Sequence, residues 1–382
     1  MPQPLESLPK QRAVADVVIV GGGIVGAATA YYLANAGVKC TLLERDSIAS
    51  HASGFAYGGI GGLGEGTVHS PTFPIATEGF RLHRQLAREI KLESGVDPEY
   101  RDRPVLALAF DRAEADAMQA HLRWQKEQQG YSVSWLGAYE LRALEPRISE
   151  RAHGAVRIDG TADVDPYRLV LALAQAAEAR GATVRSAEVV GLDIYKGKAV
   201  AVRTRLGSIP CGAVVVASGP WAAECGRWLG FRLPVRPLKG QILRLRMPGP
   251  PVGFSIGWGK HYATTKPDGL LWAGSTEEDA GFDETATAAG RDSIMSALMR
   301  MAPSTADALL VRQTACLRPV TPDGLIALGP APGVEGVFIG TGGGRQGIVL
   351  GPAMGMALAE LVVSGTSALP IAPFDPGRFV SA

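Results

Sequence analysis

The sequence predicts an α/β fold in which a parallel-sheet domain is interrupted by a second, mainly antiparallel domain. Residues 17–20 and 213–217 are short, largely β-branched apolar runs, as expected for parallel strands buried on both faces. A glycine-rich turn follows the first run, and another follows residues 337–339. A chain of 382 residues is also longer than one hydrophobic core usually supports, so we expect two domains.

The stretch from Asp16 to Glu44 contains, in order, the elements that bind a dinucleotide. In its G-x-G-x-x-G turn, Gly21 allows the tight turn, Gly23 lets the backbone approach a pyrophosphate, and Gly26 lets helix and strand pack closely. The helix that continues to about residue 33 directs free N–H groups and partial positive charge at the phosphates. Glu44 closes the second strand, 40–43, and is placed to accept hydrogen bonds from ribose hydroxyls.

The remaining elements follow from local patterns. The loop 47–62 is rich in small residues and suited to lie against a bulky ligand, and Asp111 is a candidate cap for the helix after it. The strand 213–217 ends at Ser218 and Gly219, which would stand above the sheet near the dinucleotide. Helices are predicted at 74–93, 112–129, 137–144, 166–180, 283–301 and 348–364, and strands at 104–110, 183–190, 200–206, 207–211, 238–245, 262–265, 270–274, 309–319 and 337–339.

Composition excludes several classes of function. The chain has 38 basic and 37 acidic residues without a long run of one sign, so we expect no nucleic-acid or anionic membrane partner. Four cysteines without C-x-x-C spacing indicate a reducing compartment, with no disulfide framework and no metal site. Residues 1–13 carry three prolines and lack the apolar core of a signal peptide, so we expect a frayed tail. The apolar region after them is broken by three glycines, which predicts no membrane span and a cytoplasmic protein.

The second glycine-rich turn, 340–347, leads directly into a small-residue helix. If this helix points at a flavin ring, its positive end stabilises negative charge at N1 and the C2 carbonyl of the reduced ring. The alternative is a glycine-rich helix that serves packing alone.

Four blocks carry a resemblance to a known family: SGFAYGG at 53–59, PLKGQ at 237–241, CLRPVTPDG at 316–324 and GGGRQGIVL at 342–350. With them the sequence resembles the D-amino-acid oxidase, glycine oxidase and sarcosine oxidase superfamily of FAD-dependent amine oxidoreductases, over nearly the whole chain. The resemblance implies a Rossmann-type FAD-binding domain formed by residues 13–95, 151–229 and 325–382. An inserted substrate-binding domain would then comprise residues 96–150 and 230–324.

The resemblance also implies roles for individual residues. Arg318 matches the arginine that binds a substrate carboxylate, Tyr262 falls near a pocket tyrosine, and Arg345 lies beside the flavin. A structural salt bridge at Arg318 and a plain core tyrosine at Tyr262 are the alternatives. The expected FAD contacts are Gly21, Gly23, Ile24, Val25 and Gly26 at the pyrophosphate, Glu44 and Arg45 at the adenosine, Val189 toward the adenine, Ala52, Ser53, Tyr57, Gly58 and Gly59 along the flavin, Ser218 and Gly219 above the sheet, and Gly343, Gly344, Arg345, Gln346, Gly347, Ile348 and Val349 around the isoalloxazine.

The implied reaction is oxidation of the C–N bond of an amino acid or N-alkyl amino acid, with hydride transfer to flavin N5 and hydrolysis of the resulting imine. In an oxidase of this kind, oxygen accepts the electrons from the reduced flavin. The alternatives are a dehydrogenase that passes electrons to a quinone or a partner protein, and a flavoprotein subunit of a larger complex. An NAD-dependent dehydrogenase is less consistent with the sequence, because the C-terminal glycine-rich turn, 340–347, would then have no role in binding the cofactor.

Cys316 lies two residues before Arg318, where sarcosine oxidases carry a cysteine bonded covalently to the flavin. Members that share the L-R-P block bind flavin without this bond, so we expect Cys316 to be a buried apolar residue. Covalent attachment at Cys316, or less plausibly at His51, is the alternative.

Overall fold

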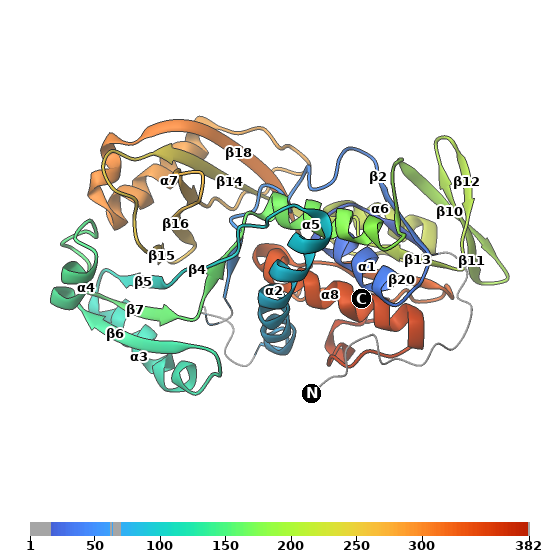
Figure 1. Cartoon of the computed structure of the whole chain (residues 1–382), viewed down its shortest axis with the longest axis horizontal. Coiled ribbons are helices and arrows are strands. Elements are labelled where there is room, and N and C mark those ends of the chain that lie inside the picture. The colour runs from blue at the N-terminus through green and yellow to red at the C-terminus, as the bar shows by residue number, and fades with distance from the viewer. Residues whose placement is uncertain (1–16, 62, 64–69, 381–382) are drawn as a thin grey trace.

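The computed structural model describes residues 17–61, 63 and 70–380. The expected frayed tail, 1–13, and Asp16 lie outside the described residues. Two large sheets dominate the molecule, one parallel and one mainly antiparallel, and they lie side by side in Figure 1. This α/β arrangement confirms the predicted fold class.

The first sheet has six strands in the order β19-β20-β13-β1-β2-β9. The central strands β1 (Val17–Val20), β2 (Cys40–Glu44), β13 (Ala213–Val216) and β20 (Val337–Thr341) are parallel, as is β9 (Thr183–Ser186), while β19 (Ala327–Pro330) is antiparallel to β20. Successive residues of β1 alternate between two cores, because Val17 and Ile19 face one and Val18 and Val20 face the other. The sheet is therefore buried on both faces, which explains the continuous apolar runs in its strands.

Helices α1 (Ile24–Asn35), α2 (Phe73–Ser94), α5 (Pro166–Ala179) and α8 (Gly347–Ser364) pack together in the core on one face of this sheet. Helix α6 (Ala222–Leu229) and the sheet of β10 (Val189–Tyr195), β11 (Lys198–Thr204) and β12 (Gly207–Pro210) contribute to the core on the other face. The segment Gly344–Ser364 has the length and hydropathy of a membrane span, but 78% of its most apolar window is buried inside the protein. Helix α8 packs against both α1 and α2, and this burial accounts for its apolar sequence.

The second sheet has eight strands in the order β18-β14-β17-β16-β15-β5-β7-β6. They are β18 (Leu309–Val320), β14 (Arg236–Arg246), β17 (Leu271–Gly274), β16 (His261–Thr265), β15 (Ser255–Trp258), β5 (Val105–Ala109), β7 (Gly154–Asp159) and β6 (Ser132–Gly137). All neighbours are antiparallel except β15 and β5. Helices α4 (Ala138–Leu144) and α7 (Ala288–Met301) cover one face, and α3 (Arg112–Lys126) packs on the other near β6 and β7.

Short elements complete the chain. A small sheet of β3 (Gly59–Ile60), β8 (Ala162–Asp163) and β4 (Arg101–Asp102) lies between the two large ones. Single 3-10 turns occupy η2 (Gly219–Trp221), η3 (Pro303–Asp307), η4 (Gly344–Gln346), η5 (Ala372–Phe374) and η6 (Pro376–Phe379).

Most predicted elements are present, and the differences have local causes. The predicted strand 183–190 is two strands, β9 and β10, which belong to different sheets. The predicted helix 283–301 begins only at Ala288, because the Thr287 side chain caps it by accepting the N–H of Gly290. Strands β3, β4, β6, β7, β8, β15 and β19 were not predicted. The Asp111 cap is confirmed, since its carboxylate accepts the N–H of Glu114 at 2.9 Å.

Strand β7 bears on the domain boundaries. It lies within 151–229, the range expected for the nucleotide domain, yet it pairs with β5 and β6 in the eight-stranded sheet. We therefore propose that this boundary falls after Asp159, while the other limits stay as predicted.

Candidate functional site

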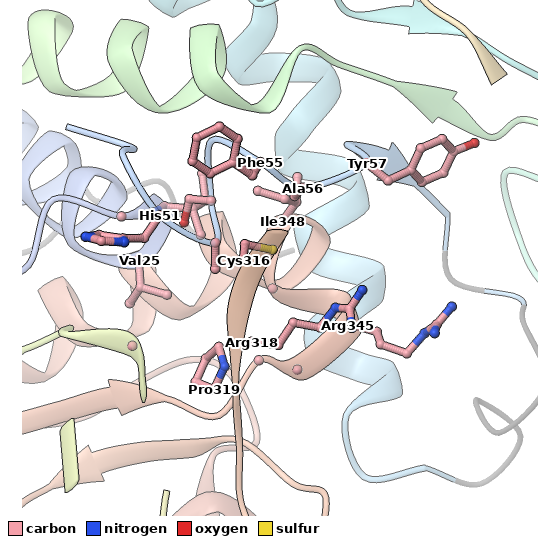
Figure 2. A pocket seen from close by; sticks show the side chains of 18 of the residues that line it. Val25, His51, Phe55, Ala56, Tyr57, Cys316, Arg318, Pro319, Arg345 and Ile348 are labelled. Carbon is pink, nitrogen blue, oxygen red and sulfur yellow. Dashed lines mark hydrogen bonds between the residues drawn. The ribbon is translucent and has the colours of Figure 1, made fainter. Parts of the chain in front are cut away.

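A single cavity of about 790 Å³ runs between the two large sheets. Its lining includes Glu44 at the end of β2 and Val189 at the start of β10, and also Arg318 and Tyr262 from the antiparallel sheet. Figure 2 shows its middle part, with Val25 and His51 on one side and Arg318 and Arg345 on the other.

The turn after β1 depends on glycines, because side chains would meet neighbouring atoms there. Gly21 has φ +110°, and a Cβ atom there would lie 2.5 Å from the carbonyl oxygen of Ala217. At Gly26 a Cβ atom would overlap the carbonyl oxygen of Gly21, so this glycine allows helix α1 to pack on the turn. A Cβ atom at Gly23 would approach only the Ser53 side chain, so this glycine leaves room on the cavity side. Gly21 and Gly26 thus allow the tight turn and the close packing predicted for them, and the approach of a pyrophosphate at Gly23 stays a prediction.

Two polar contacts organise the nucleotide end. Ser53 Oγ accepts the N–H of Ile24 at 3.0 Å, so the loop 47–61 is joined to the first turn of α1. The Glu44 carboxylate accepts the N–H groups of Gly22 at 2.7 Å and Asp46 at 3.0 Å. A carboxylate has about four acceptor positions, so two remain for ribose hydroxyls. These residues, with the glycine turn and the elongated cavity, fit a bound FAD.

Next to this end, charged and aromatic groups line the cavity. The Arg45 guanidinium lies 4.3 Å from the centre of the Trp221 ring and pairs with Asp46. His51 lies between two carboxylates, with Nε2 2.8 Å from Asp46 and Nδ1 3.2 Å from Glu284. His51 therefore connects the flavin-facing loop to the segment before α7.

Most residues predicted for the cofactor line this one cavity. They are Gly21, Gly23, Ile24, Val25, Glu44, Arg45, Ala52, Ser53, Tyr57, Gly59, Val189, Ser218, Gly219, Gly343, Gly344, Arg345, Gly347 and Ile348.

Four predicted residues do not line it. Gly26 packs under the turn, and Gly58 accepts the N–H of Val164 at 2.9 Å. Gln346 donates its N–H to Gly343 within the turn before α8. Val349 is 3% exposed and its carbonyl faces α2. A flavin would therefore meet the first residues of α8 through Gly347 and Ile348.

Arg318, on β18, lines the cavity, and its guanidinium is held by two hydrogen bonds. Its Nη1 donates to the carbonyl oxygen of Thr276 at 3.0 Å, and its Nη2 donates to Ser275 Oγ. Among the residues that the structure describes, none forms an ion pair with Arg318, whereas Arg345 pairs with Glu277 at 3.0 Å. The structural salt bridge considered as the alternative for Arg318 is therefore not seen within the described ranges.

Tyr262 stacks on Tyr57, with ring centres 4.1 Å apart. Burial raises the pKa of Tyr57 to about 12, and burial also raises the pKa of Tyr262. Tyr57 donates its hydroxyl to Ser255 Oγ at 2.9 Å. Both phenols are thus neutral hydrogen-bonding groups near neutral pH, and Tyr262 is part of the cavity wall rather than a core residue.

Cys316 and Arg318 are two residues apart on β18 and both line the cavity, as the strand alternation predicts. Cys316 is 4% exposed, and burial raises its pKa to about 11, although Arg318 opposes this. A protonated thiol is a poor nucleophile, so this environment favours a flavin held without a covalent bond.

The structure adds wall residues that we did not predict. Ser255, Gly257 and Trp258 belong to β15, and Lys260 and Glu277 flank the strands beside it. The strand β15 is four residues long and holds a glycine, so it has too little periodicity to be recognised in sequence.

Comparisons with known proteins agree with this geometry. A family model described as FAD dependent oxidoreductase matches residues 16–361. A glycine oxidase of Geobacillus kaustophilus is 33% identical over 369 residues, with 96% of this chain and 97% of the relative covered. Hydrogen cyanide synthase subunit HcnC of Pseudomonas aeruginosa is 31% identical, with 95% and 96% covered.

Solved structures are similar over the same extent. The crystal structure of glycine oxidase from Geobacillus kaustophilus superposes with a TM-score of 0.91 at 32% identity, covering 95% of this chain and 98% of that one. Iminodiacetate oxidase (IdaA) from Chelativorans sp. BNC1 gives a TM-score of 0.88 at 30% identity, covering 94% and 98%. The predicted family and the predicted cofactor, FAD, are thereby confirmed. The chain is an enzyme of the FAD dependent oxidoreductase family.

Proposed function

We propose that this protein oxidises the C–N bond of an α-amino acid or an N-substituted amino acid whose carboxylate pairs with Arg318. The observation that carries the proposal is the Arg318 guanidinium in the cavity wall, which has hydrogen bonds to Ser275 and Thr276 but no carboxylate partner in the described parts of the chain. A planar guanidinium forms two parallel, charge-assisted hydrogen bonds with a carboxylate.

The surrounding residues suit this role. Thr276 and Ser275 fix the orientation of the Arg318 fork, so little side-chain freedom is lost when a carboxylate binds. The neutral hydroxyl of Tyr262 can donate to the same carboxylate, because its raised pKa keeps its proton in place. The two residues therefore hold the α-carbon at a defined place in the cavity, which is the protein's main contribution to such a reaction.

The residues that would hold the cofactor are the glycine turn, Glu44, the loop 52–59 and the first residues of α8. The chemistry that FAD supplies when bound is acceptance of a hydride from the α-carbon, which leaves an imine that water hydrolyses. Helix α8 presents the N–H groups of its first turn and its partial positive charge at the cavity, and this favours negative charge there.

The relatives support an amine that carries a carboxylate. Glycine oxidase and iminodiacetate oxidase are named for compounds of this kind. Arg318 is the group in this chain that would recognise the feature these compounds share.

The test is anaerobic reduction of the bound flavin by a panel of amino acids and N-alkyl amino acids. The reduction is measured as the loss of flavin absorbance. Arg318→Ala should raise the substrate concentration needed by a hundredfold or more, because loss of a buried charge pair costs about 2–5 kcal/mol. It should leave the flavin bound. Arg236→Ala, which removes an exposed arginine from the neighbouring strand β14, is the matched control. An unchanged concentration dependence in Arg318→Ala would refute the role of Arg318.

The acceptor of the electrons and the assembly are tested separately. Peroxide formation with oxygen uptake supports an oxidase, and turnover only with a quinone or dye supports a dehydrogenase. The similarity to a hydrogen cyanide synthase subunit makes a multi-subunit flavoprotein the second candidate. Activity of the purified chain alone would argue against that candidate.

A further inference from the structure

The cavity is also lined by a group of side chains beyond those expected to bind FAD or the carboxylate, and we call this part of the cavity the apolar branch. It lies on the face of the eight-stranded sheet that is covered by α3. Its wall is mainly apolar, with Leu63, Val105, Ala107, Met118, Val156 and Ile158, and it also includes His121 and Gln125 of α3. Val156 and Ile158 are 3% and 7% exposed, so the wall is built into the fold and is not an open surface.

Strand register joins this branch to the substrate-binding residues. Tyr262 pairs with Gly257, Gly257 pairs with Ala107, and Ala107 pairs with Val156. Directly paired residues project on the same face of a sheet, and neighbouring strands are about 4.8 Å apart. Val156 therefore lies three strands, or roughly 14 Å, from Tyr262 along one continuous wall.

Small residues line the wall between Tyr262 and Val156 and leave a passage there. A Cβ atom at Gly257 would meet only the carbonyl oxygen of His261, at 3.5 Å. Ala107, the next residue along the wall, carries a single methyl group. At the far end, Gln125 Nε2 donates to the carbonyl oxygen of Leu63 at 2.8 Å and holds this residue against α3.

The branch exceeds what a small amino acid needs. None of the residues expected to bind FAD belongs to β5, β7 or α3, so the cofactor does not account for it. Glycine has no side chain to place there. Apolar surface that a substrate removes from water contributes about 0.8 kcal/mol per methylene group.

We propose that the physiological substrate carries an extended apolar group, an alkyl chain or an aromatic ring, on its α-carbon or its nitrogen. This group lies in the apolar branch while the carboxylate pairs with Arg318. Gly257 and Ala107 are the specificity-determining positions. The inference rests on the proposed function, since it takes Arg318 as the carboxylate anchor.

The first experiment uses the FAD-bound enzyme and two series of substrates. One is glycine with both enantiomers of alanine, norvaline, norleucine and phenylalanine, and the other is N-methyl, N-butyl and N-benzyl glycine. The second-order rate constant for anaerobic flavin reduction should rise about fourfold for each added methylene group in at least one series. Glycine or N-methylglycine as the best substrate, with rates falling as the chain lengthens, would overturn the inference and leave the proposed function intact.

The second experiment needs no reaction. Straight-chain carboxylates from acetate to octanoate are titrated into the same enzyme, and binding is followed by the change in the flavin absorption spectrum. Their dissociation constants should fall as the chain lengthens. If no amine reduces the flavin but this trend is present, the proposed function fails while the branch is supported. Equal affinities along the series would overturn the branch.

Two variants narrow the passage, Gly257→Val and Ala107→Leu. Each should reduce the preference for the longest over the shortest ligand by at least about tenfold, because the added side chain would exclude two or more methylene groups worth about fourfold each. The affinity for the shortest ligand should change much less than the affinity for the longest. Leu108→Met is the matched control, because Leu108 lies on the same strand but faces the core under α4 and α7. A preference that survives in both variants would show that the apolar group lies elsewhere.

Discussion

Replacement of His83 tests how helix α8 is held at the cavity. Pro352 lies inside α8 and has no N–H to give to the carbonyl oxygen of Ile348, four residues earlier. His83, on α2, supplies the missing donor, because its Nε2 lies 2.8 Å from that oxygen. The imidazole is 1% exposed, and burial lowers its pKa to about 4, so it is a neutral donor near neutral pH.

His83→Leu should therefore leave a buried carbonyl group without a partner. This loss costs about 1–3 kcal/mol. A change near 2 kcal/mol corresponds to roughly 4–8 °C in the melting temperature of a domain of 150–250 residues. Since Ile348 lines the cavity, FAD affinity should fall as well.

The decisive measurement is a double-mutant cycle with Pro352→Ala, monitored by thermal unfolding of the FAD-saturated protein. In the Pro352→Ala background, the new backbone N–H can donate to the Ile348 oxygen. The loss of unfolding free energy caused by His83→Leu should therefore be smaller by about 1–2 kcal/mol in that background. An equal cost of His83→Leu in both backgrounds would show that His83 does not substitute for the missing N–H group.

Three further predictions follow from single contacts. Gly26→Ala should lower the free energy of unfolding by about 1–3 kcal/mol or more and release FAD, because its Cβ atom would overlap the Gly21 carbonyl; Gly137→Ala, whose Cβ atom would come no closer than 3.7 Å to its neighbours, is the control. Acid precipitation should leave free FAD in the supernatant, since burial raises the pKa of Cys316 to about 11; a yellow pellet whose flavin maps to a Cys316 peptide would contradict this. The wild-type protein should lose stability as the pH falls from about 6.5 toward 4, because the unfolded state binds a proton at His83 that the folded state excludes; a pH dependence unchanged in His83→Leu would disprove this assignment.

The nucleotide half of the molecule was predictable because its signals are local. The turn after β1, the helix α1 and Glu44 lie within 28 residues, and each has a backbone reason for its residue type. The same holds for the second turn and α8. By contrast, His83 could not be predicted as a partner of Ile348, because 265 residues separate the two and a lone histidine in an amphipathic helix is unremarkable.

The substrate half was predictable only where a motif marked it. Arg318 and Cys316 were placed on one face of a strand by their spacing, and the structure brings both to the cavity. Strands β15 and β7 were missed, and with them the whole apolar branch. Their contribution depends on pairing between residues about 50 to 150 positions apart, such as Gly257 with Ala107 and Ala107 with Val156. No local pattern specifies such a register.

The two faces of the eight-stranded sheet explain how anchor and branch are combined. Tyr262, Gly257, Ala107 and Val156 follow one another across neighbouring strands on the cavity face, while Leu106, Leu108 and Ile256 point to the core under α4 and α7. A substitution on the cavity face changes the shape of the wall without removing a residue from that core. In the proposed function the charged anchor of the carboxylate is Arg318, which lies on a strand at the edge of the sheet, with Tyr262 as the second contact. Recognition of the carboxylate depends mainly on Arg318, and selection of the apolar group depends on the wall, so Gly257→Val should change the preference for chain length more than it changes the binding of acetate.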